Sequence, residues 1–329
     1  MRERVGDPVL TPLGFGGAPA GNLYRVVPDA DVAAAVETAW QAGIRYFDTA
    51  PHYGLGLSER RIGAALEGRA RAGFTVSTKV GRVLVPSPGT AGEPDPAGFL
   101  VPATHRRAWD FSRAGVLRSL EGSLARLGLD RIDVVYLHDP DEHEEQARRE
   151  ALPALLDLRD QGVIGAVGLG MNQTAMPARF VRECDVDLVM CAGRYTLLDQ
   201  GALADLLPAA LRYGVGIVVA GVYNSGLLAT DRPSSGATFD YVPAAAEVLA
   251  RAHRIADVCA VHGVTLPQAA LAFARAHPAV VSTVVGMQDG DQVEQTAQRA
   301  AAAVPSALWG DMRSAGQLPD DAPTPDGHR

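Results

Sequence analysis

Short apolar segments alternate with longer helix-like segments along most of this chain, and that alternation limits its fold more than any other feature. Parallel strands of one sheet need a crossover of a dozen or more residues between them, which is usually a helix. The segments predicted as strands are residues 13–16, 45–48, 75–78, 133–137, 166–170, 188–192, 216–220 and 283–285. The segments predicted as helices are residues 31–42, 58–66, 112–127, 147–161, 203–213, 242–262 and 292–303.

Eight predicted strand units in 329 residues favour a closed (β/α)8 TIM barrel, an α/β fold, over an open doubly wound sheet. We expect one domain over residues 1–329, with its core at about 13–303 and a Pro- and Asp-rich tail at about 316–329. Two Gly- and Pro-rich loops, residues 81–110 and 229–243, follow the third and seventh predicted strands. Barrel enzymes carry their active sites on the loops after the strands, so these two loops are expected beside the site.

Charge, hydropathy and cysteine content argue against several functional classes. A net charge of −8 gives no basic footprint for nucleic acid. No apolar run reaches the length of a membrane span, and Cys184, Cys191 and Cys259 lack the spacing of a disulfide framework or a zinc site. We therefore expect a cytoplasmic protein whose partner is a small molecule, without nucleic acid, membrane or metal. The sequence leaves the oligomeric state open.

Only one of the 30 basic residues is a lysine, and this residue, Lys79, directly follows the third predicted strand. Arginine presents a wide planar fork that stays protonated, whereas lysine is a compact point charge whose pKa shifts when it is buried. A chain that otherwise uses arginine is expected to keep lysine where arginine would not substitute. Lys79 is therefore a candidate catalytic residue, and the alternative is a chance survivor in an arginine-rich composition.

Three further polar residues lie at or just after the ends of neighbouring predicted strands. Asp48 ends the second strand, Tyr53 follows five residues later, and His138 follows the fourth. Strand ends of a barrel meet at one mouth, so these side chains are expected to share a pocket with Lys79. An ammonium lowers the pKa of a neighbouring phenol, a carboxylate holds the ammonium, and an imidazole can hydrogen-bond the reacting oxygen. Taken singly, each also fits a turn, surface or core role.

These residues resemble the aldo-keto reductase superfamily from about Leu13 to about Ala303. The resemblance rests on residues 44–54 (IRYFDTAPHYG), the strand end 77–79 (STK), the pair 137–138 (LH) and Asn172. It implies an NAD(P)-dependent barrel without a separate dinucleotide-binding domain. By this resemblance, Tyr53 would be the general acid–base, Lys79 would tune the Tyr53 pKa, Asp48 would pair with Lys79, and His138 would orient the substrate.

Further motifs are similar to one branch of that superfamily, which contains L-fucose dehydrogenase, D-threo-aldose 1-dehydrogenase and pyridoxal 4-dehydrogenase. They are residues 168–173 (GLGMNQ), 192–199 (AGRYTLLD), 222–228 (VYNSGLL), 137–141 (LHDPD) and 81–86 (GRVLVP). The resemblance implies NAD-dependent oxidation of the anomeric hydroxyl of an aldose to a lactone. Oxidation of pyridoxal, which also forms a cyclic hemiacetal, is the alternative, as is general aldehyde or ketone reduction.

Two other classes of protein remain as remote alternatives. Residues 138–143 (HDPDEH) are dense in potential metal ligands, as in a metal-dependent barrel hydrolase, but no His-x-His motif lies on the first strands. A non-catalytic barrel that serves as a binding partner would have little reason to keep an intact proton-transfer set.

The same resemblance places the cofactor and the substrate. Residues 282–298 contain no Lys or Arg to bind a 2′-phosphate, and Asp289, Asp291 and Glu294 would repel one. NAD is therefore expected and NADP is less favoured, although acidic residues also suit the start of a helix.

His52, Trp109 and His138 are expected to contact the substrate, while loop packing or solvent exposure would account equally well for His52 and Trp109. The residues expected to bind the cofactor are Gly17, Ala18, Asp48, Asn172, Val222, Asn224, Ser225, Gly226, Leu228, Gly286, Met287, Gln288 and Gln292. Met171, Ala192 and Ala220 depart from the pattern common in the superfamily at the nicotinamide.

Overall fold

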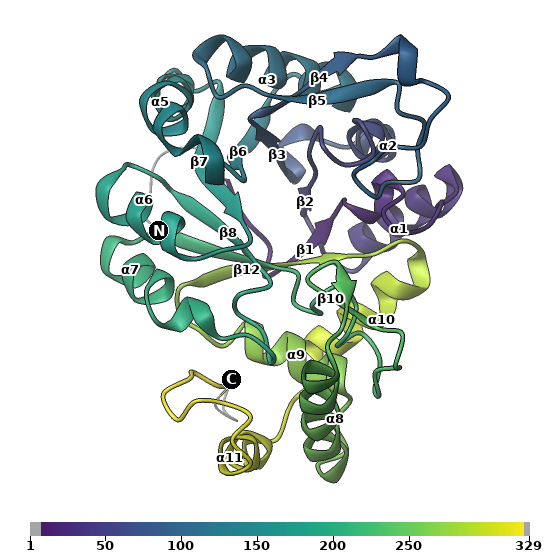
Figure 1. Cartoon of the computed structure of the whole chain (residues 1–329), viewed down its shortest axis with the longest axis vertical. Helices are drawn as coiled ribbons and strands as arrows, with labels where there is room; N and C mark the ends of the chain where they lie inside the picture. Colours follow the sequence, from purple (N-terminus) through teal and green to yellow (C-terminus); the bar gives the residue numbers. More distant parts are fainter. Residues whose placement is uncertain (1–7, 326–329) are drawn as a thin grey trace.

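Eight parallel strands close into a barrel in this computed structural model, which describes residues 8–325. The strands pair in the order β1-β12-β9-β8-β7-β6-β3-β2, and Figure 1 shows the helices arranged around them. The predicted (β/α)8 fold is confirmed. The barrel strands are β1 (Leu13–Gly16), β2 (Tyr46–Asp48), β3 (Thr75–Val80), β6 (Ile132–His138), β7 (Ile164–Met171), β8 (Leu188–Ala192), β9 (Gly216–Ala220) and β12 (Val280–Gly286).

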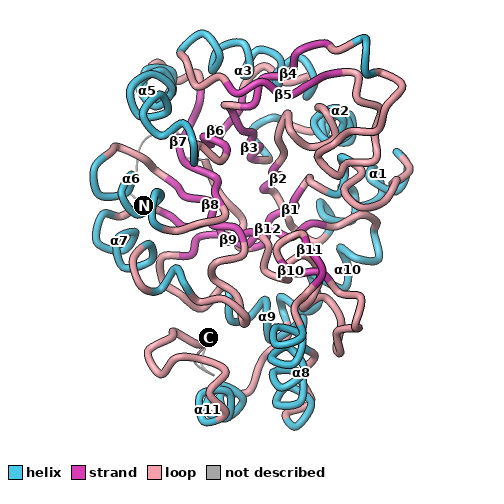
Figure 2. Tube along the Cα trace, viewed as in Figure 1, coloured by secondary structure: helices cyan, strands magenta, loops and turns pink. Residues whose placement is uncertain are grey.

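The helices cover the outside of the barrel and buttress its strands (Figure 2). Those matching predicted segments are α1 (Asp29–Gln41), α2 (Leu57–Leu66), α3 (Arg113–Leu127), α5 (Leu152–Asp160), α7 (Leu206–Tyr213), α8 (Ala246–Val261) and α10 (Gly290–Ala301). Those that the sequence pattern did not predict are α4 (Glu144–Gln146), α6 (Ala175–Glu183), α9 (Leu266–Ala274) and α11 (Ser306–Ser314). The segment predicted as one helix over 147–161 begins with a π-helical turn (Ala147–Ala151).

The core has an inner and an outer layer. Helix side chains pack on the outside of the strands, whereas Val134, Leu188 and Met190 belong to a separate buried cluster within the barrel. Tyr46 and Tyr136 belong to the inner cluster, are fully buried, and join hydroxyl to hydroxyl at 3.1 Å. Buried hydroxyl groups need such partners because an unpaired one is costly. The tyrosine pair therefore forms a satisfied polar layer adjoining the carboxyl ends of β2 and β3.

The two long loops are both partly ordered as hairpins. Residues 81–110, predicted as a loop, form an antiparallel pair of strands, β4 (Arg82–Pro86) and β5 (His105–Trp109), in which Arg82 lies opposite Trp109. The second loop contains the short strands β10 (Thr238–Phe239) and β11 (Val242–Pro243), so α8 begins at Ala246 and not at residue 242 as predicted. Both hairpins follow barrel strands at their carboxyl ends, which is the face where the candidate residues lie.

The C-terminal segment packs more closely than its composition suggested. Leu318 and Ala322 are buried, and the Arg313 guanidinium donates to the Ala322 carbonyl at 2.9 Å. The predicted tail therefore packs against α11 as far as the description extends, and its last residues, 326–329, lie outside the described part of the chain. No single described helix combines the length and apolarity that a bilayer crossing requires, although α8 and α9 together do by length and composition while bent by 97°.

Candidate active site

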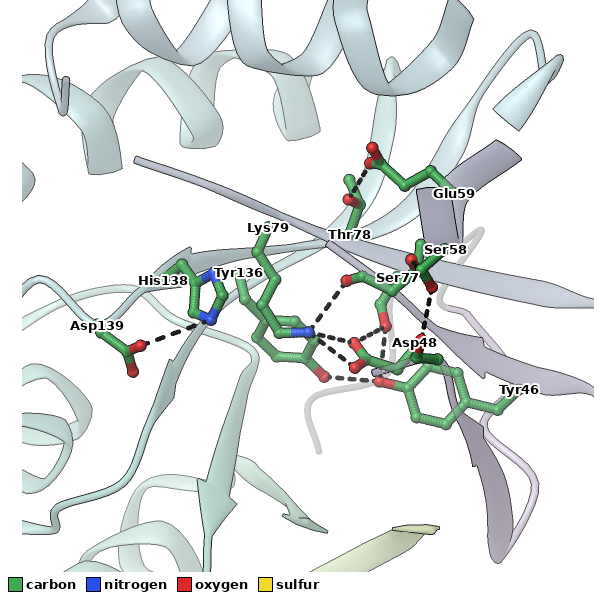
Figure 3. Close-up of polar contacts among 12 residues, drawn as sticks. Tyr46, Asp48, Ser58, Glu59, Ser77, Thr78, Lys79, Tyr136, His138 and Asp139 are labelled. Carbon is green, nitrogen blue, oxygen red and sulfur yellow. Dashed lines mark hydrogen bonds and ion pairs between the residues drawn. The ribbon is translucent and has the colours of Figure 1, made fainter. Parts of the chain in front are cut away.

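A buried ion pair between β2 and β3 forms the base of the site (Figure 3). Lys79 Nζ donates to both carboxylate oxygens of Asp48, at 2.9 and 2.7 Å, and to the Thr49 carbonyl at 3.0 Å. The Ser77 hydroxyl donates to Asp48 Oδ1 at 2.7 Å. Lys79 is 2% exposed and Asp48 is 3% exposed, so all three ammonium protons are taken up by protein oxygens. An ammonium so held has little freedom to rotate or to exchange partners.

Tyr53 lies directly beside this ion pair, in the turn between β2 and α2. Lys79 Nζ is 4.6 Å from the centroid of the Tyr53 ring. The turn holds its place because Gly54, at φ 61°, backs onto Gly21, where a Cβ on Gly54 would lie 2.3 Å from the Gly21 carbonyl oxygen. Only glycine fits both that backbone angle and that contact. The position of the phenol is thus fixed by backbone packing as well as by its own side chain.

His138 completes the cluster from the end of β6. Its ring centroid lies 6.0 Å from that of Tyr53, nearly perpendicular at 88°, and 5.5 Å from that of His52. The structure therefore brings together Asp48, Tyr53, Lys79 and His138, as expected for neighbouring strand ends of one barrel.

The electrostatics of Tyr53 differ from the sequence-based expectation. Burial raises the pKa of the Tyr53 phenol above its ordinary value, and although the Lys79 ammonium opposes that shift, it does not overcome it. Burial alone would lower the pKa of Lys79, but the Asp48 carboxylate and Tyr53 outweigh it, and the net pKa is raised. Lys79 therefore stays charged, and its positive charge reduces the cost of ionising Tyr53.

Both histidines are held in the neutral form. Burial, together with the positive charges of Arg82 and Lys79, lowers the pKa of His138 well below its ordinary value. Burial and the same two cations, with Arg107, lower the pKa of His52 to about 2. A neutral imidazole has one nitrogen that donates and one that accepts, so His138 can hydrogen-bond a substrate oxygen without carrying charge.

A cavity of about 760 Å³ opens above these residues, within the range of small-molecule sites. Of the predicted cofactor and substrate residues, Gly17, Leu228, Met287 and Trp109 do not line it. Leu228 and Met287 are buried in the core, and Trp109 is 47% exposed. The predicted residues that do line it are Ala18, Asp48, His52, His138, Asn172, Val222, Asn224, Ser225, Gly226, Gly286, Gln288 and Gln292.

Sequence reasoning missed several residues of the cavity wall. Phe99 and Gly98 come from the loop between β4 and β5, and Tyr24 comes from the loop after β1. Arg82 and Asp139 also line the cavity. They were not predicted as site residues, although both belong to motifs quoted for the resemblance. The signal that could have found them is their position, since Arg82 follows β3 closely and Asp139 directly follows His138.

The far end of the cavity lies at the start of α10. Asp289 is the N-terminal cap of this helix and accepts from the Gln292 backbone at 2.9 Å, while the Gln292 side chain accepts from the Gln288 backbone at 3.1 Å. Arg25 reaches Asp289 from the loop after β1, with an N···O distance of 3.2 Å. Asp289 therefore serves as a helix cap and as an ion-pair partner. Arg25 is a cation at this end of the cavity that residues 282–298 alone did not predict. Within residues 8–325, no group of three or more His, Cys, Asp or Glu side chains could hold a metal ion.

The chain belongs to the aldo/keto reductase family, whose family model matches residues 12–316, and is an oxidoreductase of that family. It is 46% identical to D-threo-aldose 1-dehydrogenase from Pseudomonas sp over 314 residues, which cover 93% of this chain and 94% of the relative. It is 37% identical to pyridoxal 4-dehydrogenase from Microbacterium luteolum, covering 94% of this chain and 95% of the relative. Its fold matches that of the aldo-keto reductase AKR11C1 from Bacillus halodurans with a TM-score of 0.70 at 24% identity, covering 97% and 96% of the two chains.

Proposed function

We propose that this protein oxidises the anomeric hydroxyl of an aldose to a lactone, with NAD as the hydride acceptor. The observation that carries the proposal is the buried Asp48–Lys79 pair beside Tyr53 and His138, at the base of a cavity large enough for a ligand. The 46% identity to D-threo-aldose 1-dehydrogenase over almost the whole chain supports this substrate class over others in the family.

In this direction of reaction, Tyr53 takes the proton of the anomeric hydroxyl. A phenolate is needed for that step, and burial, which raises the Tyr53 pKa, makes the phenolate costly at neutral pH. The Lys79 ammonium lowers the cost by placing a fixed positive charge beside the ring. Because His138 is neutral, it can donate a hydrogen bond to the oxygen that becomes the lactone carbonyl. We therefore expect oxidation to be faster at alkaline pH.

The cavity wall fits a nicotinamide dinucleotide. Asn224 Oδ1 is buried without a hydrogen-bond partner among the described residues, and Gly221, Gly226 and Gly286 expose backbone where side chains would narrow the cavity. Asn172 and Ser225 would hold the nicotinamide and the phosphates respectively, and Gln288 and Gln292 would face the adenosine end. The bound cofactor would supply the site that accepts hydride.

Preference for NAD over NADP follows from the residues at this end. A 2′-phosphate dianion requires charged donors, and Gln288 and Gln292 supply only neutral ones. Arg25 lies nearby, but its guanidinium is paired with Asp289. The two glutamines therefore favour NAD more than the acidic residues do, because Asp289 is engaged as a helix cap.

Pyridoxal is the second candidate substrate, favoured by the 37% identity to pyridoxal 4-dehydrogenase. Its cyclic hemiacetal offers Tyr53 and His138 the same hydroxyl chemistry.

The three cysteines are free thiols, which suits the reducing cytoplasm where we expect the protein to act.

The experiment is an NAD-reduction screen at alkaline pH over L-fucose, D-arabinose, L-galactose, L-xylose, D-glucose and pyridoxal, with native protein and Tyr53→Phe. We expect one or more aldoses to be oxidised faster than pyridoxal. Tyr53→Phe should abolish turnover and leave NAD affinity, measured by fluorescence titration, nearly unchanged, because it removes the oxygen that accepts the substrate proton and little else. Faster pyridoxal oxidation would select the second candidate, and substantial turnover by Tyr53→Phe would remove Tyr53 from the proton-transfer step.

A further inference from the structure

An ion pair on the cavity wall has no part in the proton transfer proposed above. Arg82, at the start of β4, pairs with the Asp139 carboxylate, which directly follows β6. The two residues are 57 positions apart in the sequence and both line the cavity. Their side chains are 18% and 26% exposed, so the pair is mostly desolvated yet open on the cavity side.

The pair lies beside the residues expected to meet the substrate. Asp139 Oδ2 is 3.5 Å from His138 Nε2, and an Arg82 terminal nitrogen is 3.5 Å from each ring nitrogen of His52. The guanidinium also lies over the Trp109 ring, with 4.4 Å between its central carbon and the ring centroid. Trp109 therefore contacts Arg82 without lining the cavity itself.

Hydrogen-bonding capacity is left over on both partners. Arg82 has five N–H donors, and among the described residues its terminal nitrogen that faces away from Asp139 reaches only the His52 ring, at 3.5 Å. Asp139 Oδ2 receives Arg82, but within residues 8–325 no donor reaches Oδ1. A pair whose only purpose was to hold two loops together would be expected to satisfy these atoms within the protein.

The backbone at Asp139 is also unusual. Its φ is 45°, in the left-handed region that is uncommon for residues other than glycine. The Asp139 backbone donates to the Gly170 carbonyl at 3.0 Å, which ties the strained residue to the end of β7. Strain of this kind persists where the surroundings fix it, and it is concentrated at functional sites. Here it presents a carboxylate next to His138.

We propose that Arg82 and Asp139 form a hydroxyl-reading subsite, in which the carboxylate accepts from and the guanidinium donates to adjacent hydroxyl groups of the substrate. This inference rests on the proposed aldose oxidation and makes it more specific. A polyhydroxylated ring offers donors and acceptors on neighbouring carbons, which a planar carboxylate–guanidinium pair matches. A simple aldehyde offers neither, so the subsite selects aldoses over simple aldehydes. A site with such buried polar groups rejects the analogue that lacks the hydroxyl.

The test compares the best aldose with its 2-, 3- and 4-deoxy analogues in native protein, Asp139→Asn and Arg82→Lys. Asp139→Asn keeps the size of the side chain, and Arg82→Lys keeps the charge but loses the planar fork. We expect native protein to lose about 10- to 100-fold in kcat/KM on at least one analogue. On the parent sugar, both variants should show a similar fall in kcat/KM, mainly through a higher KM. Removing the same hydroxyl group from the sugar should lower their kcat/KM little further. Asp141→Asn, the same change at an exposed position two residues away, is the matched control and should behave as native.

A purely structural role predicts a different pattern. If Asp139 served only to orient His138, its variant would lose the same factor in kcat on the parent sugar and on every deoxy analogue. That result, or an unchanged KM in both variants, would overturn the proposal. Thermal unfolding of each variant separates these outcomes from misfolding, and Arg82→Lys provides an independent measurement if Asp139→Asn does not fold.

The proposed function can fail separately. If native protein oxidises no aldose but reduces simple aldehydes with NADH, the assignment of the reaction is wrong. The subsite is then tested in reduction with glyceraldehyde against propanal, which differ in their hydroxyl groups. A preference for glyceraldehyde that disappears in Asp139→Asn would support the subsite, and an equal preference in both proteins would overturn it.

Discussion

Replacing Lys79 with Met should destabilise the fold as well as impair the site. The substitution leaves the Asp48 carboxylate, which is 3% exposed, with the Ser77 hydroxyl but without the ammonium that bonds both its oxygens. Removing one partner of a buried ion pair usually costs about 3–5 kcal/mol, because the remaining charge stays buried and uncompensated. Since the total free energy of unfolding of a domain is usually about 5–15 kcal/mol, a loss of this size would be plain in urea denaturation.

A double-mutant cycle separates the stranded charge from the loss of packing. Asp48→Asn removes the charge but keeps the shape, so the pair Asp48→Asn/Lys79→Met should be more stable than Lys79→Met alone by about 2 kcal/mol or more. Urea denaturation followed by circular dichroism measures all four proteins. If the two single changes simply add, the ion pair contributes no coupling energy, and the argument that Lys79 is fixed by Asp48 is refuted.

Three further outcomes are expected. Lys79→Arg should lower kcat nearly as much as Lys79→Met, because a wide guanidinium does not fit the enclosed space filled by the ammonium. A near-native kcat for Lys79→Arg in steady-state kinetics would contradict this. The kcat/KM with NAD should exceed that with NADP by at least ~10-fold, or about 1.4 kcal/mol. Replacing Gln288 and Gln292 with Arg should reduce this ratio. Equal kcat/KM with both cofactors in native protein would refute the preference. Because the pKa values of His52 and His138 are lowered from 6.5, the unfolded chain binds more protons below that pH, so stability should fall as the pH drops, by about 2 kcal/mol at pH 5 from His52 alone. His52→Gln should flatten that dependence in urea denaturation, and an unchanged slope would show that folding does not lower the pKa of His52.

The strands were predictable because each is a short apolar run bounded by polar or turn residues, and burial on both faces of a barrel strand demands that pattern. Helix α9 was missed because it is apolar all round: its buried residues include Leu266, Ala269, Leu271 and Phe273, so it lacks the amphipathic period. Its start was nevertheless marked in the sequence, since Thr265 caps the helix by accepting from the Gln268 backbone at 3.3 Å.

The grouping of Asp48, Tyr53, Lys79 and His138 was predictable because strand ends of one barrel converge, which makes residues distant in the sequence neighbours in the fold. The sign of the Tyr53 pKa shift was not, because it depends on the balance between burial and the Lys79 charge, and sequence gives only the charge. The placement of Trp109 failed for a similar reason. The β4–β5 pairing sets it opposite Arg82, and that register depends on contacts across the whole loop.

The solitary lysine described at the base of the site gives the protein a built-in reporter. Amine-reactive reagents can modify only one ε-amine in this chain, and that amine is 2% exposed and engaged by three oxygens. Covalent labelling of Lys79 therefore requires the barrel mouth to open far enough to release it. The rate at which the peptide that contains Lys79 gains a label, separated by mass spectrometry from labelling of the N-terminal amine, would then measure how often this ammonium is released from its partners.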